Sequence, residues 1–248
     1  MSTSTVVFIT GAGRGLCSTH LERRTLLTWT GIGRGLIKGY LQRPNHTVIG
    51  SIRDDTSPAY EELKKLPAAE GTRLILVTID SHKLEDPAKA VKAAEEAGIG
   101  HIDIVIANAG TSPPPGPLEA ADLNEVVDAF KVNTMSPIAL YQAAKPLFER
   151  SAKPIWISMS SAAASIGNAP AHQAHWLLGY GMSKAAMNFF TMAVHGGQPN
   201  FIAYAIHPGL VQTDLGNTGA RMQGMETAPI TLEDSCAKVM ASVCVTID

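Results

Sequence analysis

Two residues with complementary proton chemistry, Tyr180 and Lys184, stand four positions apart in the string YGMSK. On a helix this spacing places both side chains on one face. A free phenol has a pKa of about 10 and is a poor acid or base at neutral pH, and a neighbouring ammonium group lowers that pKa. Such a tyrosine can donate a proton to a carbonyl oxygen as the carbonyl carbon is reduced. The pair indicates carbonyl reduction, although an ordinary helix with a surface lysine has the same pattern.

A group of serines precedes this pair, in the string SMSSAA that begins at Ser158. It follows the apolar run Pro154–Ser158, which is typical of a strand buried on both faces. A serine hydroxyl at the end of such a strand can orient a substrate carbonyl beside the tyrosine, whereas a serine in a turn or at a helix cap needs no such role. Ser160 and Ser161 are the two candidates.

A glycine-rich turn follows the first apolar run, Thr5–Thr10, and reads GAGRG from Gly11 to Gly15. Glycines allow a tight turn and close approach of the backbone to a ligand, and a helix that starts there offers N–H groups and the positive end of its dipole. A strand, such a turn and a helix in this order predict a site for the pyrophosphate of a dinucleotide. A lone glycine-rich turn would be weak evidence.

The elements that must position these residues alternate along the chain. Strands are predicted at Thr5–Thr10, Thr47–Ile52, Leu74–Ile79, Ile102–Ala107, Pro154–Ser158 and Phe201–His207. Helices are predicted at Leu36–Gln42, Ala59–Lys65, Pro87–Ala97, Leu123–Phe130 continuing to Arg150, Gly179–His195 and Leu232–Ser242. This alternation of apolar strands and helices predicts a single doubly wound α/β domain of the Rossmann type, with a parallel sheet covered by helices on both faces.

The composition is that of an ordinary globular protein, with 45% hydrophobic and 17% charged residues over 248 positions. A net charge of −2 without a long run of like charges argues against nucleic acid as a partner. No apolar stretch approaches the roughly 20 residues that cross a bilayer, so no membrane partner is expected. The scattered cysteines, Cys17, Cys236 and Cys244, predict no disulfide framework and favour a cytoplasmic location.

Together, the motifs resemble those of the short-chain dehydrogenase/reductase family. They are the glycine-rich turn, NAG at Asn108–Gly110, the YxxxK pair and HPG at His207–Gly209, in this order along the chain. The resemblance implies an NAD(P)-dependent oxidoreductase that transfers hydride between CH–OH and C=O groups and acts on a small carbonyl compound. It also implies a homo-oligomer, either a dimer or a tetramer.

The resemblance assigns a role to each catalytic candidate. Tyr180 is the acid–base, and Lys184 binds the nicotinamide ribose and lowers the tyrosine pKa. The serine of the family falls on Ser161, with Ser160 as the alternative. Asn133, in the string KVNT, matches an asparagine that supports a water-mediated proton relay to the lysine, although a polar residue that kinks a helix gives the same pattern.

The cofactor type is predicted from the end of the second strand, where Arg53 follows Ile52. Family members that prefer NADP carry a basic residue there, and arginine suits a phosphate because it can donate two hydrogen bonds at once. Arg14 is a second candidate partner for the 2′-phosphate. Asp54 and Asp55 argue the other way, since an acidic residue at this point accepts from the ribose hydroxyls of NAD. We therefore expect NADP(H) to be preferred over NAD(H).

Further cofactor contacts follow from the same resemblance. Asp80 matches a residue that contacts adenine, and Val211 and Thr213 match residues that contact the nicotinamide carboxamide. The predicted cofactor set is Gly11, Arg14, Gly15, Ile32, Gly33, Arg53, Asp80, Asn108, Ala109, Gly110, Tyr180, Lys184, Pro208, Gly209, Val211 and Thr213. No metal site is predicted, because His172 and His175 have HxxH spacing but no evident third ligand.

One departure from the family pattern interrupts the phosphate loop. The strings TGAGRGL and TGIGRGL occur at Thr10–Leu16 and Thr30–Leu36, and removal of Leu16–Gly31 would restore an uninterrupted TGAGRGIGRGL. These 16 residues correspond to 16 × 3 = 48 nucleotides, the length of a short fungal-type intron, so we hypothesise an unspliced intron. The alternative is a genuine surface excursion after which Gly31–Gly35 resumes the helix. We thus predict one domain over residues 1–248 with an anomalous insertion at 16–31.

A finer resemblance is to fungal ketoreductases of the norsolorinic acid ketoreductase type, carried by residues 34–40, 45–53 and 208–217. It implies a role in secondary metabolism and the ketone of an aromatic polyketide as substrate. Trp176 then forms an apolar wall for a flat substrate, or else it is a packing anchor. The family normally adds a seventh strand after the last helix, and no matching residues follow here, so six strands are predicted. A second interpretation, a catalytically inactive or regulatory nucleotide-binding protein, follows from the interrupted loop.

Overall fold

The computed structural model describes residues 4–13 and 31–245. Within them, six strands form one parallel sheet: β1 (Thr5–Ile9), β2 (His46–Ile52), β3 (Arg73–Thr78), β4 (Ile104–Ala107), β5 (Ile155–Met159) and β6 (Ile202–Ile206). Each observed strand overlaps its predicted range. The structure therefore confirms the doubly wound sheet expected from the apolar runs.

The strand order is β3-β2-β1-β4-β5-β6, so the direction of winding reverses at β1. Val7 of β1 lies opposite Val48 on one side and Ile104 on the other, in parallel register. The chain segments that follow β1 and β4 go to opposite faces of the sheet. Open α/β sheets bind their ligands at such a switch point.

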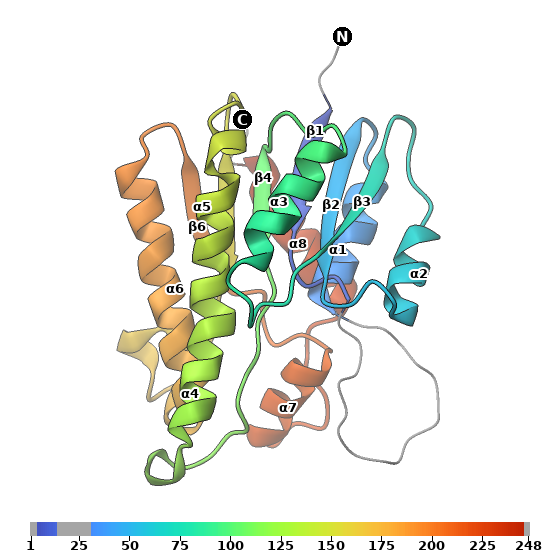
Figure 1. Ribbon diagram of the computed structural model, residues 1–248. Helices are drawn as coiled ribbons and strands as arrows, with labels where there is room; N and C mark the ends of the chain where they lie inside the picture. The colour runs from blue at the N-terminus through green and yellow to red at the C-terminus, as the bar shows by residue number, and fades with distance from the viewer. Residues whose placement is uncertain (1–3, 14–30, 246–248) are drawn as a thin grey trace.

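Helices cover both faces of the sheet, and Figure 1 shows α3 and α5 in front of it and α1 and α8 behind. The helices are α1 (Ile32–Leu41), α2 (Pro58–Lys64), α3 (Asp86–Glu96), α4 (Leu123–Phe130), α5 (Ser136–Phe148), α6 (Leu178–Gly197), α7 (Asp214–Met222) and α8 (Leu232–Val245). The sequence patterns did not predict α7. Its first turn is capped by the hydroxyl of Thr213, which accepts from the N–H of Gly216 at 3.1 Å.

Each face of the sheet has its own apolar core. Phe8 and Trp156 point to the face covered by α3, α5 and α6, where Phe148 packs against the Trp156 ring. Val7 and Ile157 point to the other face, against α1 and α8. Successive side chains of a strand thus enter the two cores in turn, which explains why the strands read as continuous apolar runs in the sequence.

Helix α1 begins at Ile32, four residues before its predicted start at Leu36. Its glycines, which disfavour a helix on propensity alone, allow α8 to approach closely. A Cβ on Gly35 would lie 2.6 Å from Cys236 Sγ, and one on Gly39 would lie 2.5 Å from Met240 Sδ. Tertiary packing on α8 therefore decides where this helix begins.

The long helix predicted from Leu123 is broken by a π-helical segment, η2 (Lys131–Met135), between α4 and α5. Pro137 has no N–H, so the carbonyl of Asn133 cannot receive the α-helical hydrogen bond from residue 137. A wider turn at such a point is common at functional sites. The part of the chain described by the structure contains no helix that is both long and apolar enough to cross a membrane.

Candidate active site

The turn after β1 is built against the end of β4. Gly11 has a φ of +75°, which only glycine adopts without strain, and a Cβ there would lie 2.9 Å from Ala109 Cα. The Thr10 hydroxyl accepts hydrogen bonds from the N–H groups of Asn108 and Ala109, both at 2.9 Å. The NAG string therefore fixes the glycine turn at the switch point between β1 and β4.

The start of α1 closes the same turn from its other side. A Cβ on Gly33 would lie 2.6 Å from both the Gly11 carbonyl oxygen and Asn108 Nδ2. Gly31 precedes the helix and offers no side chain to cap the first N–H groups, and no acidic residue lies in the first turn. A helix start of this kind suits an anion such as a pyrophosphate. Arg14, Gly15 and residues 16–30 of the predicted insertion lie outside the described residues.

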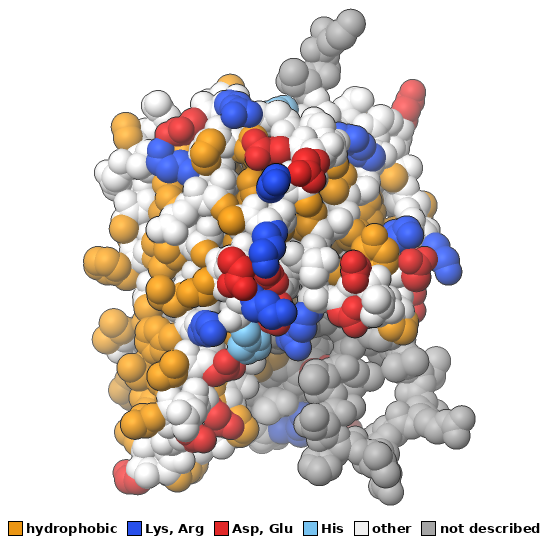
Figure 2. Space-filling view, in the orientation of Figure 1, with side chains coloured by type: hydrophobic (Ala, Val, Ile, Leu, Met, Phe, Trp, Pro, Cys, Tyr) orange, Lys and Arg blue, Asp and Glu red, His pale blue; other side chains and the backbone are white. Residues whose placement is uncertain are grey.

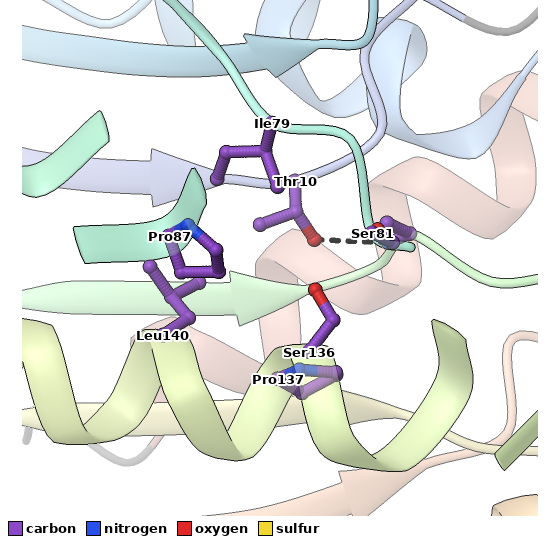
Figure 3. A pocket seen from close by; sticks show the side chains of 8 residues that line it. Thr10, Ile79, Ser81, Pro87, Ser136, Pro137 and Leu140 are labelled. Carbon is purple, nitrogen blue, oxygen red and sulfur yellow. Dashed lines mark hydrogen bonds between the residues drawn. The ribbon is translucent and has the colours of Figure 1, made fainter. Parts of the chain in front are cut away.

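A small hollow lies beside this turn on the face covered by α3 and α5 (Figure 3). The hydroxyl groups of Thr10 and Ser136 point toward it, and Ile79, Pro87 and Leu140 close its apolar side. Its volume of about 10 Å³ has room for about one water molecule. The hollow is therefore part of the packing under the site and not a substrate pocket.

Tyr180 and Ser161 meet through their side chains at the carboxyl end of β5. Ser161 follows the strand in extended conformation and caps η3 (Ala162–Ala164), with its hydroxyl 3.2 Å from the N–H of Ala163. Gly181, next to the tyrosine, allows α6 to approach this segment, since a Cβ there would lie 3.0 Å from the Ala163 carbonyl oxygen. Ser160 points elsewhere and donates to Asn188 Oδ1 at 2.6 Å.

The pKa of Tyr180 differs from the expectation of a lysine-lowered phenol. Burial raises the pKa of Tyr180 above its ordinary value of 10.0, and the hydrogen bond with the Ser161 side chain opposes this shift. Lys184 Nζ lies 5.9 Å from the tyrosine ring centroid and donates a hydrogen bond to the Met159 carbonyl oxygen at 2.7 Å. The i, i+4 spacing of Tyr180 and Lys184 correctly predicted that both lie on one helix, α6 (Leu178–Gly197). It did not predict which group the Lys184 ammonium contacts.

Lys184 and Asn133 converge on Gly110, at the end of the NAG string. A Cβ on Gly110 would lie 3.2 Å from Lys184 Nζ and 3.1 Å from Asn133 Oδ1. The lysine side chain is buried, with 4% of the residue exposed. A buried ammonium group held by a backbone carbonyl keeps a fixed position, which suits it to bind a ligand hydroxyl.

Asn133 is the joint between three segments of the site. Its Oδ1 accepts from the N–H of Thr111 at 2.7 Å, and its Nδ2 donates to the Thr111 carbonyl oxygen at 2.8 Å and to the Ser183 hydroxyl at 2.9 Å. Only 1% of the residue is exposed. The asparagine thus ties the π-helical segment to the loop after β4 and to α6.

The predicted adenine end lies at the carboxyl ends of β2 and β3. Burial acts to raise the pKa of the Asp80 carboxyl group, but hydrogen bonds from His82 outweigh it and lower this pKa, with a smaller contribution from the charge of the exposed Arg53. Asp54 is engaged locally, because its Oδ1 accepts from the N–H of Thr56 at 2.8 Å and from the Thr56 hydroxyl at 2.6 Å. Asp54 Oδ1 is thus engaged within its own turn, while Arg53 is exposed and lies near Asp80.

The segment after β6 closes the opposite end. Gly209 has a φ of +90°, and the Pro208 carbonyl oxygen accepts from the Ser235 hydroxyl of α8 at 2.8 Å. Val211 is buried and forms an isolated parallel bridge with Ile230. The two ends of the segment that contains α7 therefore lie side by side. Thr213 lies two residues further on as the cap of α7.

A loop between β5 and α6 covers the carboxyl end of β6. Burial and the nearby charge of His172 lower the pKa of His207. Trp176 is 40% exposed, and its carbonyl oxygen accepts from the N–H of Gly116 at 3.0 Å. Trp176 is thus held at the surface of the loop and not in a core. No group of three or more His, Cys, Asp or Glu able to hold a metal occurs among the residues that the structure describes.

The sequence patterns missed four residues that shape the site. Ser183 holds Asn133, the Met159 carbonyl oxygen holds Lys184, and His82 lies between Asp80 and Asp128. Ser183 stands inside YGMSK and could have been found from its place on the helix face of the pair. The contacts of Lys184 with Met159 and of His82 with Asp128 join segments far apart in the sequence and leave no local signal.

Comparison with known proteins agrees with this geometry. The family described as short chain dehydrogenase matches residues 28–223, a range that includes the second glycine-rich string but not the first. Short-chain dehydrogenase srdF of Neurospora crassa is 42% identical over 240 residues, which cover 96% of this chain and 88% of that protein. The norsolorinic acid ketoreductase of Aspergillus parasiticus is 34% identical over 241 residues, which cover 96% and 83% of the two chains.

Solved structures show the same fold. An NADPH-bound carbonyl reductase from chicken fatty liver superposes with a TM-score of 0.77 at 24% identity, over 95% of this chain and 85% of that one. A carbonyl reductase from Pseudomonas aeruginosa gives a TM-score of 0.73 at 27% identity, over 98% and 92% of the two chains.

Proposed function

The chain belongs to the short-chain dehydrogenase family and is an oxidoreductase of that family, and from this premise we propose that it is an NADPH-dependent ketoreductase. The observation that carries the proposal is the hydrogen-bonded pair of Tyr180 and Ser161, beside Lys184 and the glycine turn at Gly11. A phenol, a hydroxyl and a fixed ammonium group are the donors that carbonyl reduction needs.

The proton chemistry falls to Tyr180. When bound, a nicotinamide cofactor supplies the hydride. Tyr180 donates its phenolic proton to the substrate carbonyl oxygen, and Ser161 donates a hydrogen bond that orients the same oxygen. Because burial raises the pKa of Tyr180, the phenol holds its proton at neutral pH, which suits a proton donor in the reductive direction.

Lys184 and Asn133 hold this pair in place. Lys184, buried and donating to the Met159 carbonyl oxygen, is suited to bind the hydroxyl groups of the nicotinamide ribose. Asn133 fixes the loop that follows Gly110 through two hydrogen bonds to Thr111, so that the site keeps its shape. Its place beside Lys184, on either side of Gly110, fits the proton relay expected from the family resemblance.

Preference for NADPH is supported by Arg53, which is exposed at the end of β2 and lies near Asp80. A guanidinium group there can donate two hydrogen bonds to a 2′-phosphate. The Asp54 carboxylate accepts from the backbone N–H and the hydroxyl of Thr56 within its own turn, through Oδ1. Arg53→Ala should weaken NADPH binding about tenfold and leave NADH binding unchanged. Arg73→Ala, at the opposite end of the next strand, is the matched control.

The proposed substrate is an aromatic ketone. Trp176 and Ile166 are exposed large apolar side chains on the loop between β5 and α6, at 40% and 84%. The hydrogen bond from the Gly116 N–H to the Trp176 carbonyl oxygen holds Trp176 next to the loop after β4. Exposed apolar side chains beside a catalytic pair suit a flat apolar substrate. The relative from Aspergillus parasiticus, a norsolorinic acid ketoreductase by name, supports this class.

We further propose that a second copy of this chain covers an apolar face formed by α4, η2 and α6. Its exposed side chains are Leu123, Val127, Met135, Met182, Phe189 and Met192. Figure 2 shows the hydrophobic side chains gathered over these helices on the left of the molecule. A patch of this kind on one face marks an association surface. Phe189→Glu should lower the mass measured by light scattering to that of a monomer, whereas Lys92→Glu on α3 should not.

Oxidation of NADPH, followed with a panel of aromatic ketones, tests the proposed function. We expect turnover by the protein, faster with NADPH than with NADH, and loss of turnover in Tyr180→Phe. A variant that lacks residues 16–31 should be assayed beside it, because these residues interrupt the phosphate loop. Turnover only after the deletion would support an unspliced intron. Folded protein without turnover in either form would contradict the proposed function and favour a protein that binds nucleotide without catalysis.

A further inference from the structure

His82 lies between two carboxylates from different elements of the fold. Its Nδ1 is 3.1 Å from Asp80 Oδ1, and its Nε2 is 3.0 Å from Asp128 Oδ1. The backbone N–H of His82 also donates to Asp80 Oδ1, at 3.1 Å. Both ring nitrogens of His82 therefore lie within hydrogen-bond distance of a carboxylate oxygen. The resulting bridge joins the loop after β3 to α4.

The contacts with His82 hold the side chain of Asp80. Its backbone is held by Lys83 of the same loop and by Asp86 at the start of α3. The N–H of Asp80 donates to Asp86 Oδ2 at 3.2 Å, and its carbonyl oxygen accepts from the N–H of Lys83 at 2.8 Å. The backbone N–H and the Nδ1 atom of His82 both contact Asp80 at Oδ1. Asp80 Oδ2 lies 4.0 Å from Lys83 Nζ.

We propose that His82, held in place by Asp128, is a positioning residue that orients Asp80 for the adenine end of the cofactor. The inference rests on the proposed function and on the family resemblance, which implies that Asp80 contacts adenine. With Oδ1 occupied by His82, Oδ2 accepts from the adenine amino group. Asp128 stands 46 positions from His82 on α4 and has no other predicted role, so its part in the site depends on the tertiary fold.

Calorimetric titration with two cofactor fragments tests this proposal. Adenosine 2′,5′-bisphosphate represents the adenine end, and nicotinamide mononucleotide represents the other end. In His82→Ala and Asp128→Ala, the Kd of the bisphosphate should rise about threefold to tenfold, the range for loss of one hydrogen bond. The double variant should bind no more weakly than His82→Ala, because both changes break one bridge. The Kd of the mononucleotide and kcat at saturating NADPH should not change.

His101→Ala is the matched control, because His101 makes a similar contact with Asp103, 3.2 Å away, at the amino end of β4. Partial recovery of bisphosphate binding in Asp128→Asn, whose amide oxygen still accepts from the imidazole, would support positioning. Thermal unfolding of each variant distinguishes a loss of binding from a loss of folding. If His82→Ala does not fold, the bisphosphate titration is carried out with Asp128→Asn instead. Equal bisphosphate binding by the wild type and His82→Ala would overturn this inference alone. Failure of the wild type to bind the bisphosphate would overturn the proposed function as well.

Discussion

The side-chain amide of Asn133 donates a hydrogen bond to the hydroxyl of Ser183, 2.9 Å away, and so joins the π-helical segment to the helix that carries Tyr180 and Lys184. Ser183 in turn donates to the Tyr180 carbonyl oxygen at 2.8 Å. The neighbouring Thr134 hydroxyl adds a second link, to the Ser183 carbonyl oxygen at 2.9 Å. These hydrogen bonds hold η2 and α6 in a fixed position relative to each other.

Asn133→Ala should lower the free energy of unfolding by about 1–3 kcal/mol, because it leaves the buried Ser183 hydroxyl and the part-buried backbone groups of Thr111 without this partner. Denaturant unfolding measures this change. Asn124→Ala, at an exposed position of α4, should change the same quantity by less than about 0.5 kcal/mol. Equal effects of the two substitutions would contradict the role of Asn133 as a joint.

Ser161→Ala should reduce kcat about 100-fold, because a donor to the carbonyl oxygen is lost. Ser160→Ala should keep kcat within about threefold, and should instead cost about 1 kcal/mol of stability since Asn188 loses its donor. Steady-state kinetics and unfolding of both variants distinguish the two serines. The reverse pattern would make Ser160 the catalytic residue.

Gly33→Ala should weaken cofactor binding more than tenfold, because its Cβ would lie 2.6 Å from the Gly11 carbonyl oxygen and push α1 away from the turn. Fluorescence titration with NADPH measures the Kd. In Gly100→Ala nothing lies within 4 Å of the added Cβ, and binding should be unchanged. A Gly33→Ala protein with wild-type affinity would show that the cofactor does not use this turn.

Reduction should be independent of pH through the neutral range and should fall only above the ordinary phenol pKa of about 10. Burial raises the pKa of Tyr180, so the proton that it donates is present below that pH and is lost as pH rises through the shifted pKa. Since the hydrogen bond with Ser161 opposes the shift, Ser161→Ala should move the alkaline limb to higher pH. A limb near neutral pH in the wild type would refute this assignment.

Stability should decline at alkaline pH through Cys236. Burial raises the pKa of this thiol from 9.0 to about 12, with a smaller contribution from Glu233. The folded state therefore keeps a proton that the unfolded chain releases, and this contribution is complete below pH 9.0 and is lost as pH rises toward about 12. The loss is up to about 1.4 kcal/mol per pH unit. Unfolding of the wild type should depend more steeply on pH than that of Cys236→Ala, and equal slopes would contradict the prediction.

The six strands could be predicted because each reads as an apolar run, although only the inner strands are buried along most of their length and the edge strands β3 and β6 are partly exposed. The boundaries of α1 and the segment at Lys131–Met135 could not be predicted, for different reasons. Helix α1 starts early because Gly35 and Gly39 pack on α8, a contact between distant segments. The π-helical segment follows from Pro137, which is a local signal in the sequence. The sequence patterns indicated Asn133 as a residue that kinks a helix, but they did not indicate Pro137.

By itself, the sequence determined the family, the sheet and the spacing of Tyr180 and Lys184, because periodicity and short motifs are properties of neighbouring residues. The tertiary structure decided that Ser161 and not Ser160 meets Tyr180, that burial raises the tyrosine pKa, and that Lys184 points to the Met159 carbonyl oxygen. It also joined Asp80 and Asp128 through His82. Burial and the direction of a side chain depend on elements that meet only when the sheet has formed, and so no local pattern encodes them.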